Sequence, residues 1–271
     1  MRLAHICPPG LLTDVIDDEE DYHLVLTGLV LRNEQYRSFY AERSHRGDLV
    51  ILDNDAYENT GKSTPIEELV SAISYIDPTV AVLPDLRGAS WDYNFKLAEA
   101  AALMLSAAYP TLQLMGVAHG ATLERYLASA LMLASLPGVS WIGVYEETWD
   151  DFRIPRQDMV RLLSPINAKI HLLGLTEDMR DVKDAFVRQR VEGSDSCKLI
   201  RWGLHGSNIR PTDSFVPEYP GRGTDYFDRG PDDPDWVAYH SCVRGNIRRW
   251  REHLRTVDEP LRLVDDGSPA A

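Results

Sequence analysis

Apolar runs typical of buried β-strands recur along the chain at nearly regular intervals. They begin 24 to 33 residues apart, near positions 23, 49, 79, 112, 139, 168 and, more weakly, 192. Amphipathic stretches with helical spacing lie between several of them, over 64–75, 90–108, 121–135 and 176–189. Continuous apolar strands that alternate with helices form parallel sheets covered by helices. Seven or eight such units favour closure, so the pattern predicts a (β/α)8 barrel of the TIM type, in the α/β class.

The repeat is interrupted in three places. Residues 1–7 either pair with the barrel or cover one end of it. The segment 206–236 is rich in Pro, Gly, Asp and aromatic residues, which predicts a long irregular segment that faces the substrate. A C-terminal helix is expected after it, and residues 256–271 are expected to form a flexible tail. Because no low-complexity linker divides the chain, we expect a single domain over 1–271.

Five of the predicted strands end in, or are followed closely by, a side chain that can carry chemistry. These residues are Asp53, Asp85, His119, Glu146 and Asp195. In a (β/α)8 barrel, the loops at the carboxyl ends of the strands build the active site. We therefore expect the five side chains to gather in one site, and the excess of carboxylates indicates an enzyme that uses carboxylate chemistry.

Composition narrows the classes of function. The net charge of −14 argues against loose, charge-driven binding of nucleic acid. The chain has neither a GxGxxG turn after its first strand nor a GxxxxGK[ST] loop, so the usual nucleotide-binding α/β folds lose support. No apolar run reaches the roughly 18 residues of a transmembrane helix, and no signal-peptide pattern is present. The three cysteines, Cys7, Cys197 and Cys242, make no disulfide framework, so we expect a cytoplasmic protein that does not enter a membrane.

Arginine dominates the basic residues, with 23 Arg against 5 Lys. Its planar guanidinium group suits phosphate and carboxylate. The predicted C-terminal helix reads VRGNIRRWREHLR over 243–255 and carries Arg244, Arg248 and Arg249. This helix either contacts a phosphate backbone or presents an ordinary solvated face.

Two segments combine an acidic residue with a second functional group. In ILDNDAYEN (51–59), Asp53 ends a strand and Tyr57 follows four residues later. A carboxyl group beside an aromatic ring suits a flat, hydrogen-bonding heterocycle, although Asp53 alone is equally consistent with a capping role. In GSDSCKLIRWG (193–203), Asp195 and Arg201 lie six residues apart, which suits attack on a sugar carbon beside a phosphate or, alternatively, the start of a helix.

Together these segments resemble the tRNA-guanine transglycosylase superfamily. Its DSGG[YF]Q stretch carries an acid/base Asp and a stacking aromatic residue, and Asp53, Asn54 and Tyr57 fall at the matching places for its Asp, Ser and aromatic residue. Its later FDC…PTR stretch carries a nucleophilic Asp with an Arg six residues on, which is the spacing of Asp195 and Arg201.

Further landmarks agree in order and spacing, so the resemblance covers about residues 48–205. VLPD, with Asp85, resembles the FDE strand end whose Asp reads the base, and GVAHG, with His119, stands where the family has GVVQGG with a base-contacting Gln. WIGVYE, with Gly143 and Val144, resembles the GLAVGE strand end whose backbone faces the base. HLLGL at 171–175 matches the YLMG segment that precedes the nucleophile.

The chain also departs from the family pattern. Asp55-Ala56 replaces the Gly-Gly pair, and Glu58 replaces the Gln. The CxCxxC zinc site is missing, and an isolated His240/Cys242 pair is not a zinc site, so neither a zinc subdomain, a metal nor a cofactor is expected. Short, zinc-less relatives with such substitutions look like the phage-type DNA 7-deazaguanine transglycosylases (DpdA-like), which exchange guanine in DNA for a 7-deazaguanine base.

The resemblance implies a pentosyltransferase in which Asp195 is the nucleophile and Asp53 is the general acid and base. The residues implied to bind the base are Asn54, Tyr57, Asp85, His119, Gly143 and Val144. Arg201 and the basic helix would hold the nucleic-acid backbone. The implied partners are DNA, with its guanosine flipped out or single-stranded, and a free 7-deazaguanine base, with a homodimer possible. The 7-cyano base (preQ0) is expected because no acidic group obviously waits for an aminomethyl tail, and neither Glu146 nor His205 receives a role.

Three other interpretations stay open. A tRNA-guanine transglycosylase acting on tRNA would usually bring the zinc site and further RNA-binding domains. A non-catalytic partner subunit would be indicated by loss of the nucleophile, whereas Asp53 and Asp195 are both present. An unrelated barrel hydrolase that acts on a small glycoside is the last alternative.

Overall fold

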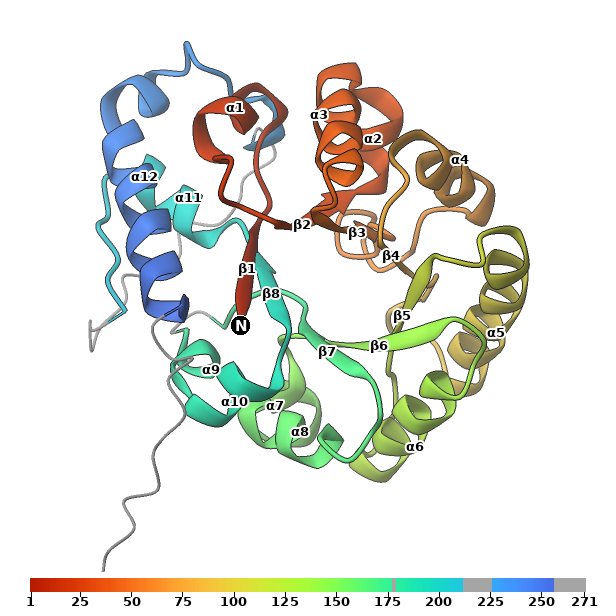
Figure 1. Cartoon of the computed structure of the whole chain (residues 1–271). Coiled ribbons are helices and arrows are strands. Elements are labelled where there is room, and N and C mark those ends of the chain that lie inside the picture. Colours follow the sequence, from red (N-terminus) through yellow and green to blue (C-terminus); the bar gives the residue numbers. More distant parts are fainter. Residues whose placement is uncertain (177–178, 212–225, 256–271) are drawn as a thin grey trace, which may run out of the picture.

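Eight parallel strands form a nearly closed barrel in the computed structural model, which describes residues 1–176, 179–211 and 226–255. The hydrogen-bonded order is β1-β8-β7-β6-β5-β4-β3-β2, and β1 and β2 face each other across the seam (Figure 1). The strands are β1 Arg2–His5, β2 Tyr22–Leu26, β3 Leu49–Asp53, β4 Val80–Val82, β5 Gln113–Val117, β6 Val139–Val144, β7 Lys169–Leu172 and β8 Gly193–Ser196. The predicted (β/α)8 barrel is confirmed.

Helices alternate with the strands and cover the outside of the barrel (Figure 1). They are α1 Leu12–Val15, α2 Thr27–Arg32, α3 Glu34–His45, α4 Ile66–Ile76, α5 Trp91–Ala108, α6 Leu123–Ala134, α7 Thr148–Phe152, α8 Arg156–Leu163, α9 Arg180–Lys183, α10 Ala185–Arg190, α11 Lys198–Leu204 and α12 Pro234–Arg255, with short 3-10 turns at Pro9–Leu11 and Tyr226–Asp228. No helix in the described part of the chain is long and apolar enough to cross a membrane.

Burial explains why the strand runs are so uniformly apolar. Val50, Ile51 and Leu52 of β3 are all fully buried, as in a parallel strand covered on both faces. Residues 1–7 prove to contribute β1, in which Ala4 pairs with Asp195 of β8. The first strand therefore lies directly beside the carboxylate predicted to be the nucleophile.

The apolar run from His23 to Leu31 is not one continuous strand, as its pattern predicts. β2 ends at Leu26, and Thr27 begins α2. The Thr27 hydroxyl donates to the carbonyl of Asp53 at 2.5 Å, which ties the turn to the neighbouring strand end. The apolar residues after the turn face the core from a helix, and a short buried helix has the same run of apolar residues as a strand.

The C-terminal helix forms as predicted but begins within the segment that was expected to be irregular. α12 begins at Pro234 and packs beside α11 against the barrel (Figure 1). The contact is close: a Cβ atom on Gly203 would lie 2.5 Å from the Cα of Val243. Residues 212–225 of the predicted irregular segment and the predicted tail, 256–271, lie outside the described residues.

Candidate active site

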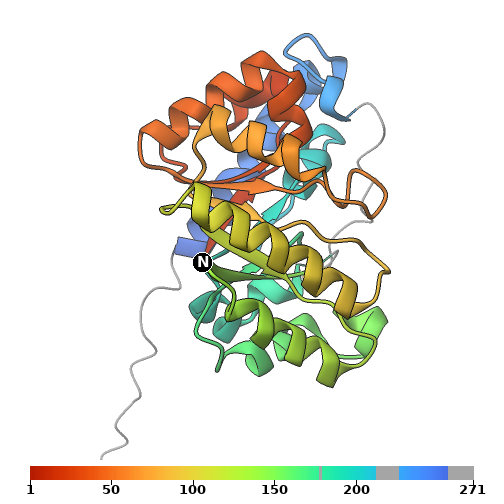
Figure 2. The same ribbon diagram turned by 90° about the vertical axis from the view of Figure 1, so that its right-hand side faces the viewer.

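A single cavity of about 940 Å³ opens at the carboxyl ends of the strands. In Figure 2 the orange loop between β3 and α4 projects at the end of the barrel opposite the N-terminus, and this loop forms part of the cavity wall. The five strand-end residues all line it: Asp53, Asp85, His119, Glu146 and Asp195. The expectation that they gather in one place is confirmed.

Asp195 lies near the end of β8 and is 5% exposed. Its Oδ1 accepts hydrogen bonds from His171 Nε2 at 3.0 Å and from the backbone N–H of Gly174 at 3.1 Å. Both hydrogen bonds among the described residues go to Oδ1, which leaves Oδ2 for a substrate. Two N–H donors suit the ionised form of a carboxylate.

Asp53 ends β3 and has a contrasting environment. Burial raises the pKa of its carboxyl well above the ordinary value, and the nearby charges of Glu58, Asp55 and Asp195 raise it further. A backbone N–H from Asp55, at 3.1 Å from Asp53 Oδ2, opposes this effect. Asp53 therefore keeps a proton at a higher pH than an ordinary carboxyl group, as a general acid requires.

Asp55 explains one of the departures from the family pattern. Its backbone has φ 58°, in the left-handed region where Gly, Asn and Asp are tolerated, so an Asp replaces the family's Gly without changing the turn. Its Oδ2 accepts the backbone N–H of Gly28 at 2.5 Å, and burial raises its pKa to about 7. One oxygen from each of Asp53, Asp55 and Glu58 lies within 4.8 Å of the others, so these three carboxyls share protons or are within reach of one cation.

Asn54, Asp85 and His119 form a chain of hydrogen bonds along the cavity wall. Asn54 Nδ2 donates to Asp85 Oδ1 and to the carbonyl of Leu83, each at 2.7 Å. His119 Nε2 lies 2.7 Å from Asp85 Oδ2. Because both amide hydrogens of Asn54 are donated within the protein, Asn54 orients Asp85, and Asp85 together with His119 presents the polar edge of the wall.

Aromatic rings flank this polar edge. The His119 ring stacks against Tyr145, with ring centroids 6.1 Å apart and planes inclined by 20°. Tyr57 also lines the cavity but is 73% exposed, so it lies at the mouth. Gly143 and Val144 are not among the described residues of the cavity wall; the carbonyl of Val144 accepts from Arg156, and Tyr145 and Glu146 reach the cavity from this strand instead.

The predicted backbone-binding arginines lie away from the cavity. Arg201 is 5% exposed, and its guanidinium carbon lies 5.8 Å from the ring centroid of Tyr226. Arg244 contacts Asp14, Arg249 bonds to Asn246, and Arg248 is exposed on α12. None of these four arginines is among the described residues that line the cavity.

The direction of α12 accounts for this separation. Further along the helix, Arg251 forms ion pairs with Asp17 at 2.5 Å and with Glu20, and both acids lie just before β2 begins. The second half of α12 therefore approaches the amino-terminal end of the barrel, whereas the cavity opens at the carboxyl ends of the strands.

The structure also adds residues that sequence reasoning missed. His171, in the HLLGL segment, bonds to Asp195, and Lys198, three residues after Asp195, donates to Glu146 Oε1 at 2.9 Å. Burial raises the pKa of Glu146, and the nearby Lys198 opposes that rise. The only available signal was closeness in sequence to a motif, because neither residue ends an apolar run. His205 is exposed and is not part of the described cavity wall.

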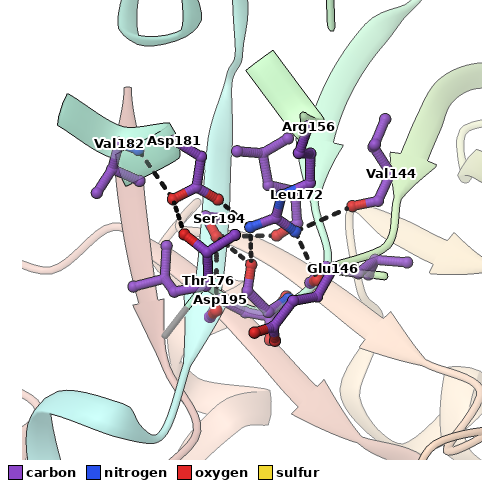
Figure 3. Close-up of polar contacts among 12 residues, drawn as sticks. Val144, Glu146, Arg156, Leu172, Thr176, Asp181, Val182, Ser194 and Asp195 are labelled. Atoms are coloured by element: carbon purple, nitrogen blue, oxygen red, sulfur yellow. Dashed lines mark hydrogen bonds and ion pairs between the residues drawn. The ribbon is translucent and has the colours of Figure 1, made fainter. Parts of the chain in front are cut away.

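A buried ion pair supports the loops beside Asp195 (Figure 3). Arg156 pairs with Asp181 and also donates to the carbonyls of Leu173 at 2.9 Å and Gly174 at 2.7 Å. Thr176 donates to the other oxygen of Asp181 at 2.9 Å. Because the N–H of Gly174 bonds to Asp195, this network fixes one of the two donors that hold the carboxylate.

Comparison with known proteins adds no relative to this picture. No protein-family model matches the chain, and no curated protein matches it. The function is therefore argued from the residues and geometry of the cavity.

Proposed function

We propose that this protein is a transglycosylase that exchanges guanine in DNA for a 7-deazaguanine base through a covalent intermediate on Asp195. The observation that carries the proposal is the pairing of two unlike carboxyls in one cavity. Asp195 accepts two N–H hydrogen bonds that suit a charged carboxylate, while burial and nearby charge raise the pKa of Asp53. A nucleophile and a proton donor need these opposite settings.

The first half-reaction uses each carboxyl once. Asp195 Oδ2 attacks C1′ of the target deoxyguanosine, and the bond between C1′ and N9 of guanine breaks. Asp53 gives its proton to the departing guanine, so the base leaves neutral and the sugar stays bound to Asp195 as an ester.

The second half-reaction reverses these roles. Asp53, now a carboxylate, takes the proton from N9 of the incoming 7-deazaguanine, and that nitrogen attacks C1′. The ester bond to Asp195 breaks and its carboxylate is regenerated, so the sugar keeps its original configuration, as in retaining glycosidases. Water is not consumed, and no oxidant or reductant is needed.

The wall opposite the carboxyls offers groups for reading a base. Asp85 and His119 present hydrogen-bonding atoms, and the Tyr145 ring adds a flat apolar face. Glu146, the acidic group nearest in sequence to this wall, already pairs with Lys198. A matched charge favours an uncharged substituent on the incoming base, which supports the 7-cyano base over an aminomethyl base.

A cavity of about 940 Å³ is larger than one base needs and lies below an open mouth. The target nucleotide must leave its stack to enter it. Aromatic and cationic groups stand at the mouth: Tyr57 is 73% exposed, and Arg125 lies with its guanidinium carbon 5.6 Å from the ring centroid of Trp91. Stacking surfaces and arginine are the groups that bind the neighbours of an extruded nucleotide, so the strand would cross this mouth.

Replacing Arg125 by Ala is therefore expected to weaken binding of a single-stranded oligonucleotide several-fold and to reduce the dependence of affinity on salt by about one phosphate contact. Arg248→Ala removes an equally exposed arginine from α12 and is the matched control. Fluorescence anisotropy at two salt concentrations measures both variants. A larger loss in Arg248→Ala than in Arg125→Ala would contradict this path for the strand.

Base exchange itself tests the proposed function. Guanine-containing DNA and tRNA are each incubated with the protein and a radiolabelled 7-cyano-7-deazaguanine base, and label in the polymer is counted. We expect incorporation into DNA and not into tRNA. Label in tRNA alone would assign the chain to the tRNA enzymes, and label in neither polymer would refute the exchange reaction.

A further inference from the structure

A buried chain of three side chains connects opposite parts of the barrel to Asp195. The hydroxyl of Tyr22, on β2, lies 2.6 Å from His171 Nδ1, and His171, on β7, reaches Asp195 through Nε2 at 3.0 Å. Tyr22 is 2% exposed and His171 is fully buried. Neither residue lines the described cavity wall, so neither is placed to contact a substrate.

The sequence of β8 makes room for this chain. A Cβ atom on Gly193 would lie 2.4 Å from the Tyr22 ring, so only glycine permits the ring to lie there. The next residue, Ser194, donates to the carbonyl of Leu172 at 2.9 Å and fixes β8 to β7. The segment Gly193-Ser194-Asp195 is thus built around the Tyr22 ring, the neighbouring strand and the carboxylate in turn.

Hydrogen-bonding capacity fixes the direction of the chain. An ionised carboxylate only accepts, so His171 donates from Nε2 to Asp195. Nδ1 is then the acceptor, and the Tyr22 hydroxyl donates to it. Burial raises the pKa of Tyr22 well above its ordinary value, which keeps the hydroxyl protonated and able to donate.

We infer that His171 is a positioning residue for the nucleophile and that Tyr22 holds His171 in the tautomer that this role requires. Together with the N–H of Gly174, His171 holds Oδ1 and so presents Oδ2 to C1′ in one orientation. The same donor stabilises the carboxylate that leaves when the ester breaks. This inference rests on the proposed function, because it assigns the two residues to the nucleophile of that reaction.

A set of three variants tests the inference. His171→Leu keeps the volume and removes the donor, His171→Gln restores an N–H near the position of Nε2, and Tyr22→Phe removes only the hydroxyl while keeping the ring against Gly193. We expect kcat for base exchange to fall about 100-fold in His171→Leu and about 10-fold in Tyr22→Phe, with KM for the free base changed by less than about twofold. His171→Gln is expected to recover about tenfold over His171→Leu.

Thermal unfolding of each variant separates positioning from folding. If His171→Leu does not fold, Tyr22→Phe, which loses one oxygen atom, still tests the chain. Wild-type kcat in Tyr22→Phe and in any folded His171→Leu, or a higher KM with unchanged kcat, would overturn the inference. Failure of the proposed function looks different, because the wild-type protein would then exchange no base at all.

Discussion

Asp195→Asn is expected to reduce base exchange by at least about 10³-fold, because the amide cannot form the glycosyl ester on which the reaction depends. The substitution is nearly isosteric, and the amide oxygen still accepts from His171 and from the N–H of Gly174. We therefore expect the folded structure and the affinity for oligonucleotide to be retained. Exchange is measured as labelled base incorporated into DNA per unit time.

Glu192→Gln is the matched control for this variant. It makes the same change of charge three residues earlier, on a side chain that pairs with Arg2 and is not part of the described cavity wall. Exchange by Glu192→Gln is expected to stay within about twofold of wild type. Substantial exchange by Asp195→Asn would remove Asp195 from the role of nucleophile.

Asp53→Asn is expected to lower the rate of exchange by about 10² to 10⁴-fold, the usual contribution of general acid–base catalysis, without loss of DNA binding. The raised pKa of Asp53 also gives the wild-type rate a pH dependence. The protonated form is the acid in the first half-reaction, so the rate falls as pH rises through that pKa. A pH–rate profile of wild type and variant measures this, and the variant is expected to lose that limb.

Stability gives the opposite sign and so acts as an internal control. A carboxyl with a raised pKa is neutral in the fold at a pH where it is ionised in the unfolded chain. The free energy of unfolding therefore decreases as pH rises from the ordinary value of 3.8 toward the raised pKa. Asp53→Asn removes this penalty, so its Tm at neutral pH is expected to equal or exceed that of wild type. A variant that loses both activity and Tm would make Asp53 structural rather than catalytic.

The barrel and its cavity were predictable because they depend on local pattern. Buried parallel strands must be apolar along their whole length, and Asp53, Asp85 and Asp195 mark the carboxyl ends of three of them. Position along a strand decides position in the barrel, so strand-end residues meet without further information. The boundary after Leu26 was not predictable in this way, because α2 is short and buried and has no periodicity that separates it from a strand.

Roles that depend on side-chain direction could not be predicted from spacing. Arg201 keeps the six-residue separation from Asp195, yet α11 turns it inward beneath Tyr226. The arginines of α12 form a basic stretch in the sequence, yet several pair with acids such as Asp14 and Asp17 that are distant in the chain. His171 was overlooked for the same reason, since its importance lies in a contact with β8 that only the closed barrel creates.

The most direct measurement of the central claim is the mass of the protein after reaction with DNA in the absence of an incoming base. The protein is incubated with a guanine-containing single-stranded oligonucleotide, denatured, digested and analysed by mass spectrometry. The account predicts an adduct whose mass is that of the oligonucleotide lacking guanine, attached to the peptide that carries Asp195, and its absence in Asp195→Asn. Base exchange that proceeds without any such adduct, or an adduct on a different residue, would contradict the account.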